Sequence, residues 1–315
     1  MSTMKTPLKY INKEYVQPPH TACPGCALPL AMRYLLKAIG GKVILAIPPG
    51  CGSIIASYPK RIFKYQGENI PVLATPLGSA ASCASGLKTA LVARGDTETE
   101  VVACVGDGGT YDIGLGGLSG VAERNEDIMY VCYDNELYGN TGGQRSSATP
   151  WGARTVTSLP PTQKMEYKKD IMSIMAAHGI PYLATATIAY PDDLMRKAQK
   201  AREIYGFRFI HILTPCVTGW FFRSEQTVEV SRLAVETKIF PLLEIENGTK
   251  FIINKQPEGI PVAEYIKLQG RYQHLTSEQI AEFQRTVEER WERLQWLASY
   301  GNQSKDEGDY PTAKR

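Results

Sequence analysis

Short apolar runs alternate with segments of helical apolar spacing over the first two thirds of the chain. The apolar runs end in glycine, proline or polar residues, as the buried strands of parallel sheets do. The predicted strands are residues 42–47, 100–105, 127–136, 182–189 and 207–216. The predicted helices are residues 28–39, 79–95, 111–125, 168–179 and 191–206. Strands that alternate with helices in this way predict an α/β fold, a parallel sheet with helices on both faces.

The pattern changes after about Trp220, and the change predicts a chain of three parts. These are an N-terminal arm at residues 1–19, an α/β domain at residues 20–223 and a largely helical C-terminal extension at residues 224–315. The segments of the extension with helical spacing are residues 224–237 and 276–299. Thr276 and Gln279, at the start of the second segment, have the spacing of a capping box. The polar tail from residue 301 is expected to be loose.

Composition and charge exclude several classes of protein. The chain is 43% hydrophobic and 21% charged, with a formal net charge of +3. Its charges are interspersed, so we expect no binding of nucleic acid. No apolar run reaches the roughly 18 residues that a membrane span needs, and residues 1–10 lack the apolar core of a signal peptide. The number of cysteines, seven, is odd, which does not suit a secreted protein held together by disulfides. We therefore expect a protein of the reducing cytoplasm.

A glycine turn with one carboxylate follows the second predicted strand. This strand ends in Gly106, Asp107, Gly108 and Gly109. Glycines at the carboxyl end of a strand let the backbone approach an anion closely. The carboxylate of Asp107 would repel a bare phosphate, so a hard cation such as Mg²⁺ is expected between them. The simpler alternative is an ordinary glycine turn in which the aspartate caps the following helix.

Asn135 lies at the end of the next predicted strand, one helix and one strand after Asp107. A Gly-Asp-Gly sequence followed at this interval by asparagine resembles the thiamine-diphosphate motif. The resemblance implies that Asp107, the side chain of Asn135 and the backbone carbonyl of Leu137 bind Mg²⁺. The residues that the resemblance assigns to the cofactor are Gly52, Ser53, Gly106, Asp107, Gly108, Gly109, Asn135, Leu137, Tyr138, Asn140 and Thr141.

The loop that follows, "LYGNTGGQRSSATPWGA", makes the family to which the chain is similar more specific. It is similar to the asparagine-threonine-glycine loop of the pyruvate:ferredoxin oxidoreductases. The similarity places Asn140 and Thr141 beside the thiazolium ring and the substrate, as the catalytic residues of this chain. The structural alternative for Asn140 is a residue that tolerates a left-handed turn.

Four of the seven cysteines lie in segments that resemble turns. Cys23 and Cys26 form a Cys-x-x-Cys pair, and Cys51 and Cys216 each follow a predicted strand. A Cys-x-x-Cys pair alone fits a redox disulfide, half of a zinc site or part of an iron–sulfur cluster. No second such pair completes a zinc ribbon, and four thiolates from converging loops suit a [4Fe-4S] cluster. The same oxidoreductase family implies these four cysteines as ligands. The remaining cysteines, expected in the core, are Cys83, Cys104 and Cys132.

The resemblance extends from residue 20 to about residue 243 and implies a beta subunit. The implied reaction is oxidative decarboxylation of a small 2-oxo acid, pyruvate for preference, to acetyl-CoA and CO₂, with electrons passed to ferredoxin. The implied partners are an alpha subunit that supplies the catalytic glutamate and binds the aminopyrimidine, and gamma and delta subunits with ferredoxin-type clusters. No such glutamate is evident in this chain, so we expect it to be inactive alone.

Other functions remain open from the sequence. The turn "PPGCGS" around Cys51 departs from the pattern of pyruvate-type enzymes, which favours a related oxalate oxidoreductase as an alternative. Oxalate would give CO₂ without coenzyme A. A cluster-free thiamine carboligase or decarboxylase, and a non-catalytic electron-transfer or zinc-binding module, are the competing classes. The sequence leaves the roles of His20 and Arg145 undecided.

Overall fold

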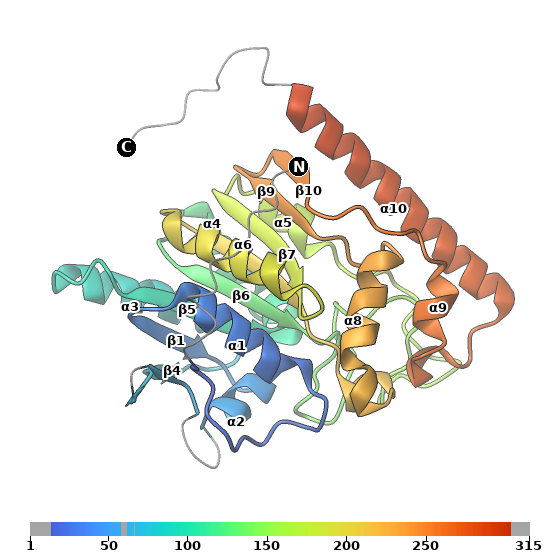
Figure 1. The fold of residues 1–315 in the computed structure, drawn as a ribbon, viewed down its shortest axis with the longest axis horizontal. Helices are drawn as coiled ribbons and strands as arrows, with labels where there is room; N and C mark the ends of the chain where they lie inside the picture. The colour runs from blue at the N-terminus through green and yellow to red at the C-terminus, as the bar shows by residue number, and fades with distance from the viewer. Residues whose placement is uncertain (1–13, 58–61, 66, 304–315) are drawn as a thin grey trace.

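An eight-stranded sheet, mostly parallel, forms the centre of the protein (Figure 1). The structure is a computed structural model that describes residues 14–57, 62–65 and 67–303. The strand order is β10-β9-β7-β8-β6-β5-β1-β4. The strands are β1 (Val43–Ile47), β4 (Val72–Ala74), β5 (Glu100–Gly106), β6 (Met129–Asp134), β7 (Tyr182–Thr187), β8 (Arg208–Leu213), β9 (Leu243–Glu246) and β10 (Lys250–Ile253). A separate hairpin joins β2 (Lys64–Tyr65) to β3 (Glu68–Asn69).

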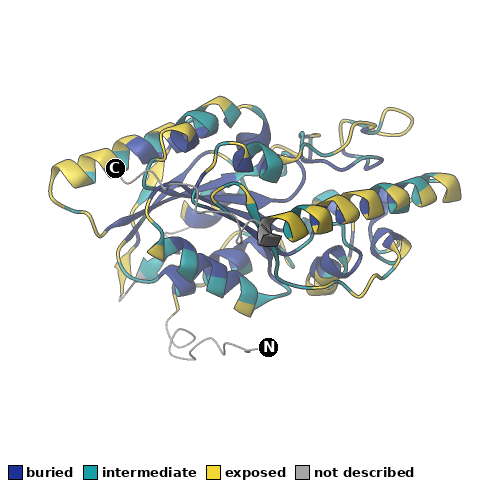
Figure 2. Ribbon diagram, turned by 90° about the horizontal axis from the view of Figure 1, so that it is seen from above, coloured by how far each residue is buried: buried dark blue, intermediate teal, exposed yellow. Residues whose placement is uncertain are grey.

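Helices cover both faces of the sheet, as the sequence predicts. The α-helices are α1 (Ala27–Ile39), α2 (Cys51–Ser57), α3 (Ala80–Ala93), α4 (Leu115–Glu123), α5 (Ile171–Ala176), α6 (Pro191–Glu203), α7 (Val217–Trp220), α8 (Thr227–Glu236), α9 (Val262–Ile266) and α10 (Ser277–Gln303). Alternate residues of β5 face opposite sides: Val102 packs in the cluster with α1, α2 and α6, and Val101 packs with α3, α4, α5 and α10. Figure 2 shows the buried strands between helices whose outer surfaces are exposed.

Two strands at one edge of the sheet come from the segment expected to be largely helical. β9 pairs antiparallel with β7 and with β10, so residues after position 224 complete the sheet. The four residues of β9 alternate apolar and acidic side chains, a strand pattern that is too short to be distinctive in the sequence. Glu244 is nevertheless buried, because Lys200 of α6 binds it at 2.6 Å. Long-range ion pairs of this kind are invisible to a reading of local pattern.

The ends of the chain agree with the predictions only in part. Most of the predicted arm lies outside the described residues, and Val16 forms an isolated antiparallel bridge with Phe63. The capping box at the start of α10 is confirmed. The Thr276 backbone N–H donates to Gln279 Oε1 at 2.9 Å, and the Gln279 N–H donates to Thr276 Oγ1 at 3.3 Å. Helix α10 continues to residue 303, and the rest of the predicted loose tail lies outside the described residues.

No helix in the part of the chain that the structure describes has the length and apolar character needed to cross a membrane.

Candidate cofactor site

The glycine turn and Asn135 meet at the ends of two neighbouring parallel strands. β5 and β6 pair in a register that sets Gly106 opposite Tyr133. The chain therefore delivers Asp107 and the residues after Asp134 to the same edge of the sheet. Asp107 is 1% exposed, and the Ser146 hydroxyl donates a hydrogen bond to its Oδ2. The turn continues into η2 (Gly108–Asp112), a single π-helical turn, so helix α4 starts later than the sequence predicts.

Three oxygen atoms converge where the resemblance implies magnesium ligands. The side-chain oxygen of Asn135 lies 2.7 Å from the carbonyl oxygen of Leu137 and 2.9 Å from Oδ1 of Asp107. Oxygens this close repel unless a proton or a cation lies between them, and a rotated Asn135 amide would donate to both. In an octahedron with the metal–oxygen distance that Mg²⁺ requires, neighbouring oxygens lie ~2.9 Å apart. The three groups therefore fit magnesium as well as they fit a rotated amide.

Glu136, between two of these groups, has a left-handed backbone with φ 63°. This conformation is unusual outside glycine and must be held by its surroundings. Oδ1 of Asp134 accepts the Glu136 N–H at 2.9 Å. The buried Glu136 carboxylate binds Lys168 at 2.7 Å and Arg271 at 2.7 Å. Two cations from distant segments thus fix the bend that brings Leu137 beside Asn135.

Arg271 also acts on Asn135 through Trp220. Its guanidinium lies 3.8 Å from the centre of a Trp220 ring, and Trp220 Nε1 donates to the carbonyl of Asn135 at 2.8 Å. Trp220 and Arg271 are 0% and 2% exposed. Trp220 belongs to α7, the short helix that begins directly after Cys216. Sequence analysis missed Arg271, Trp220 and Lys168, because nothing in their local sequence marks these contacts.

A buried ion cluster surrounds Asp134. Its Oδ2 accepts hydrogen bonds from Lys168 at 2.6 Å and from His211 Nε2 at 2.7 Å, and Tyr111 contributes a further one at 3.2 Å. Burial works against an ionised Asp134, but the charge of Lys168 and the hydrogen bond from His211 outweigh it and hold the pKa of this carboxyl well below its usual range. The pKa of Asp107 shifts the other way, because burial and then the negative charge of Asp134 raise it well above the ordinary value. An added cation would relieve this cost at Asp107.

Side chains of β6 and the following loop support the two glycine turns. A Cβ at Gly108 would lie 2.2 Å from the ring of Tyr138, whose hydroxyl donates to Asp112 at 3.0 Å. A Cβ at Gly52 would lie 2.8 Å from the hydroxyl of Tyr133, which accepts the Gly52 N–H at 3.2 Å. Ser53, also assigned to the cofactor by resemblance, donates through its hydroxyl to the Gly50 carbonyl at 2.9 Å.

The loop beyond Tyr138 leaves its predicted catalytic residues in solvent. Asn140 and Thr141 are both exposed. Thr141 donates through its hydroxyl to Gln144 Oε1 at 2.5 Å, which closes the turn on itself. Within the described residues, neither forms a hydrogen bond with Asp107, Asn135 or Leu137.

The four cysteines expected to bind a cluster lie around this loop. A Cβ at Gly139 would lie 3.5 Å from Sγ of Cys51 and 3.1 Å from the Asn135 amide nitrogen. Burial, and then the negative charges of the Cys216, Cys51 and Cys23 thiolates, raise the pKa of Cys26 to about 12. Burial and the charges of Cys216 and Cys23 raise that of Cys51 to about 11. The four sulfur atoms therefore lie close enough together for ionisation of one thiol to disfavour ionisation of Cys26 or Cys51. Within the described residues, however, no three His, Cys, Asp or Glu side chains are gathered as metal ligands.

The other residues singled out from the sequence lie apart from the three oxygens. Cys104 and Cys132 are 1% and 0% exposed, as expected of core residues. Cys83 is only partly buried, with its sulfur 3.6 Å from the Ser79 hydroxyl, so its assignment to the core is wrong. His20 is exposed, and Arg145 pairs with Glu166 at 3.2 Å.

Comparison with known proteins identifies the family. The family described as "Thiamine pyrophosphate enzyme, C-terminal TPP binding domain" matches residues 50–212. The chain is 46% identical to pyruvate synthase subunit PorB of Methanocaldococcus jannaschii, over 91% of this chain and 98% of that one. It is 45% identical to ketoisovalerate oxidoreductase subunit VorB of Pyrococcus furiosus, over 91% and 94%. The chain belongs to this PorB/VorB family of thiamine enzymes.

A solved structure agrees with the family at the level of the fold. The 2-oxoglutarate:ferredoxin oxidoreductase from Magnetococcus marinus matches with a TM-score of 0.55 and 27% identity, covering 65% of this chain and 67% of that one. The match supports the α/β fold predicted from the sequence. PorB/VorB members are named as subunits, so the chain belongs to a class of oxidoreductases built from several polypeptides.

Proposed function

We propose that this chain is the thiamine-diphosphate-binding beta subunit of a 2-oxoacid:ferredoxin oxidoreductase. The observation that carries the proposal is the convergence of the Asp107 carboxylate, the Asn135 side-chain amide and the Leu137 carbonyl, with contacts of 2.7 and 2.9 Å. In the proposed reaction a 2-oxo acid, coenzyme A and two oxidised ferredoxins give an acyl-CoA, CO₂, a proton and two reduced ferredoxins. Thiamine diphosphate supplies the electron sink for loss of CO₂ from the 2-oxo acid.

The residues of this chain bind and orient the cofactor. Asp107, Asn135 and Leu137 would hold Mg²⁺, which would supply positive charge for the diphosphate. Gly108 keeps the turn beside the diphosphate free of a side chain, and the ring of Tyr138 lies against it. Lys168 and Arg271 hold Glu136 so that the magnesium ligands keep their positions.

We also propose that Cys23, Cys26, Cys51 and Cys216 bind a [4Fe-4S] cluster. Support comes from the proximity of the four sulfur atoms and from the approach of Cys51 to Gly139, next to the magnesium motif. Within the described residues these thiols do not form a group of three metal-ligating side chains.

A partner is needed to complete the active site. The exposed positions of Asn140 and Thr141 support an alpha subunit that covers this loop and supplies the glutamate for the aminopyrimidine. Partners with ferredoxin-type clusters then carry electrons to ferredoxin. A cluster-free carboligase or decarboxylase is the alternative that needs neither these partners nor an electron acceptor.

The proposed reactions differ in their substrate. Pyruvate is preferred, and oxalate is the alternative favoured by the "PPGCGS" turn around Cys51. The relatives named for pyruvate and for ketoisovalerate are almost equally similar, at 46% and 45% identity, so overall identity does not separate these two substrates.

A substrate panel on the assembled complex tests the proposal. Reduction of ferredoxin is measured with pyruvate, 2-oxoisovalerate or oxalate, each with and without coenzyme A. Coenzyme A-dependent reduction with pyruvate supports the preferred reaction. Reduction with oxalate alone, independent of coenzyme A, would replace pyruvate by oxalate. Turnover of a 2-oxo acid without any reduction of an acceptor would overturn the oxidoreductase assignment.

A further inference from the structure

A cavity of about 190 Å³ lies between the sheet and helix α10, next to the ion cluster. Glu136 and Lys168 contribute to its lining, but Asp107, Asn135 and Leu137 do not. The cavity is thus distinct from the oxygens proposed to bind magnesium, although the two sites share part of one wall. Its presence is not explained by the proposed function.

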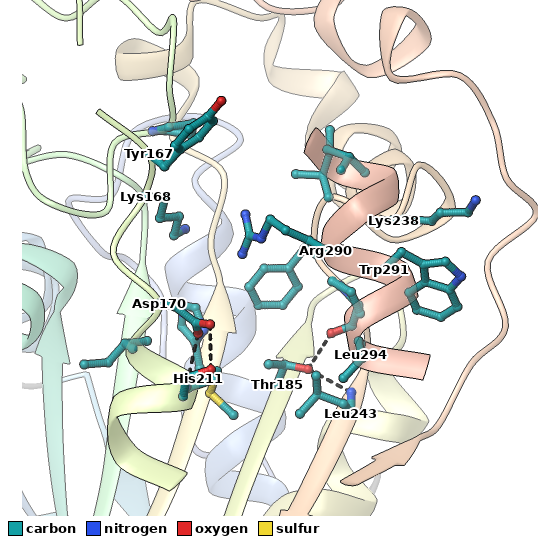
Figure 3. Close-up of a pocket in the computed structure, with 18 of the residues that line it drawn as sticks. Tyr167, Lys168, Asp170, Thr185, His211, Lys238, Leu243, Arg290, Trp291 and Leu294 are labelled. Carbon is teal, nitrogen blue, oxygen red and sulfur yellow. Dashed lines mark hydrogen bonds between the residues drawn. The ribbon is translucent and has the colours of Figure 1, made fainter. Parts of the chain in front are cut away.

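The cavity has apolar walls and a polar inner end. Trp291 and Leu294 of α10 form one side, and Leu243 of β9 contributes another (Figure 3). His211 and Thr185 lie at the inner end, on neighbouring strands of the sheet. Both hydroxyl functions of Thr185 are used, since it donates to the Pro241 carbonyl at 2.6 Å and accepts the Leu243 N–H at 2.9 Å.

His211 brings an unsatisfied polar atom to this inner end. The residue is 4% exposed, and its Nε2 is 2.7 Å from Asp134 Oδ2. Its Nδ1 has no hydrogen-bond partner within the described part of the chain. With Nε2 donating to Asp134, a neutral ring presents Nδ1 as an acceptor. Buried polar atoms normally have partners, so an unpaired one beside a cavity indicates that something else can bind there.

Positive charge dominates the lining. Five cationic side chains line the cavity, against the two carboxylates of Glu136 and Asp170. The cationic residues are Lys168, Lys169, Lys238, Arg290 and Arg293. Among the residues that the structure describes, Arg290, Arg293 and Lys238 form no ion pair. Figure 3 shows Arg290 extending from α10 toward Lys168. Lys168 is already paired with Asp134 and Glu136, so an anion there would meet mainly the unpaired charges of Arg290, Arg293 and Lys238.

We propose that this cavity binds a small monocarboxylate with an apolar body. The carboxylate pairs with Arg290, and the body packs against Trp291 and Leu294. The size fits, because a cavity of ~150 Å³ lined by apolar side chains takes benzene, and this one can also hold a short carboxylate arm. A hydroxyl on the far end of the ligand can donate to His211 Nδ1. The carboxylate bound here is a ligand and not the reacting 2-oxo acid, because no proposed magnesium ligand lines the cavity.

Phenylacetate is a suitable probe, and 2-phenylethanol is its uncharged match. Binding to the full-length protein is measured by calorimetry and by tryptophan fluorescence, without thiamine diphosphate. We expect phenylacetate to bind at least about tenfold more tightly than 2-phenylethanol. Arg290→Gln should remove this preference, and Leu294→Trp should abolish binding of both by filling the cavity. Arg285→Gln, a charge loss on the same helix outside the cavity, should change nothing.

The absence of saturable phenylacetate binding at millimolar concentration would overturn the proposal. Equal binding by the wild type, Arg290→Gln and Leu294→Trp would do the same. Arg290 is exposed, so its variant still decides the matter if Leu294→Trp does not fold. Because thiamine diphosphate is left out, the result is independent of whether the proposed cofactor function is correct.

Discussion

The side-chain oxygen of Asn135 lies 2.9 Å from Oδ1 of Asp107, although the two residues come from different strands. A contact between two acceptors is unfavourable unless a proton or a cation separates them. The same pair of residues carries the resemblance to thiamine enzymes. The sequence resemblance favours a cation at this position, and the geometry fits either that cation or a rotated Asn135 amide that donates to both oxygens.

The first prediction concerns Asp107 itself. Asp107→Ala should abolish magnesium-dependent binding of thiamine diphosphate, because the diphosphate loses the ion that links it to the protein. Calorimetric titration with and without Mg²⁺ measures the effect. Asp192→Asn, an exposed carboxylate in the first turn of α6, is the control and should bind normally. Tight binding by Asp107→Ala would show that the ion is held elsewhere.

The second prediction uses two glycines on either side of one turn. Gly108→Ala should weaken thiamine diphosphate binding by at least about tenfold, because the added Cβ would lie 2.2 Å from the Tyr138 ring. Gly116→Ala, in the neighbouring helix α4, has no atom within 4 Å of its added Cβ and should bind as the wild type does. Equal affinities for the two variants would remove the steric role from Gly108.

The third prediction concerns Arg271. Arg271→Met should reduce the free energy of unfolding by about 3–5 kcal/mol, because it leaves the buried Glu136 with only one cationic partner. The affinity for Mg²⁺ and thiamine diphosphate should also fall, through Glu136 and Trp220. Chemical denaturation and calorimetry measure the two effects. Arg285→Met, at a surface arginine that pairs with Glu282, should cost less than about 1 kcal/mol. A stable Arg271→Met protein with normal cofactor affinity would contradict the positioning role.

The fourth prediction separates the cysteines by iron content. Single alanine substitutions at Cys23, Cys26, Cys51 and Cys216 should each lower iron and sulfide per chain or change the EPR signal. Cys104→Ala should keep the full complement and lose only packing, about 1 kcal/mol. The measurement uses anaerobically purified protein. A full cluster in Cys216→Ala, or a lost cluster in Cys104→Ala, would show that the proposed ligands are wrong.

The fifth prediction concerns pH and the edge of the sheet. Burial disfavours ionised Glu244, but Lys200 and Arg196 outweigh burial and lower its pKa to about 2. A pKa below the unfolded value of 4.5 means that ionised Glu244 stabilises the fold above pH 4.5. This stability, up to about 3 kcal/mol, is lost as the pH falls from 4.5 toward 2. Glu244→Gln should flatten the pH dependence of unfolding in this range, whereas Glu264→Gln on the surface should leave it unchanged.

The elements that the sequence predicts are those whose signal lies within one short segment of the chain. The strand before Asp107 and the strand before Asn135 each carry a local apolar signal, and the order of the chain makes them neighbours. The cation partners could not be found in this way. Glu136 pairs with Lys168 and Arg271, and these contacts depend on how distant loops return to the sheet.

Strand β9 illustrates the same limit for secondary structure. Glu244 is polar by sequence but buried in the fold, because Lys200 neutralises it. The start of α4 was also missed, since the π-helical turn at Gly108–Asp112 precedes it and keeps the glycine turn close to the strand. In both cases the local preference yields to a contact made elsewhere.

The pairing of Glu136 with Arg271 has a consequence for the order of folding. Glu136 lies in the middle of the chain, whereas Arg271 lies shortly before helix α10. The bend between the magnesium ligands therefore gains its second cation only after residue 271 has been synthesised. Closure of such a long loop is slow compared with the formation of local helices. A nascent chain that has already formed β5 and β6 therefore still lacks a rigid magnesium motif. The motif becomes rigid only when the segment that carries Arg271 has packed beside Glu136.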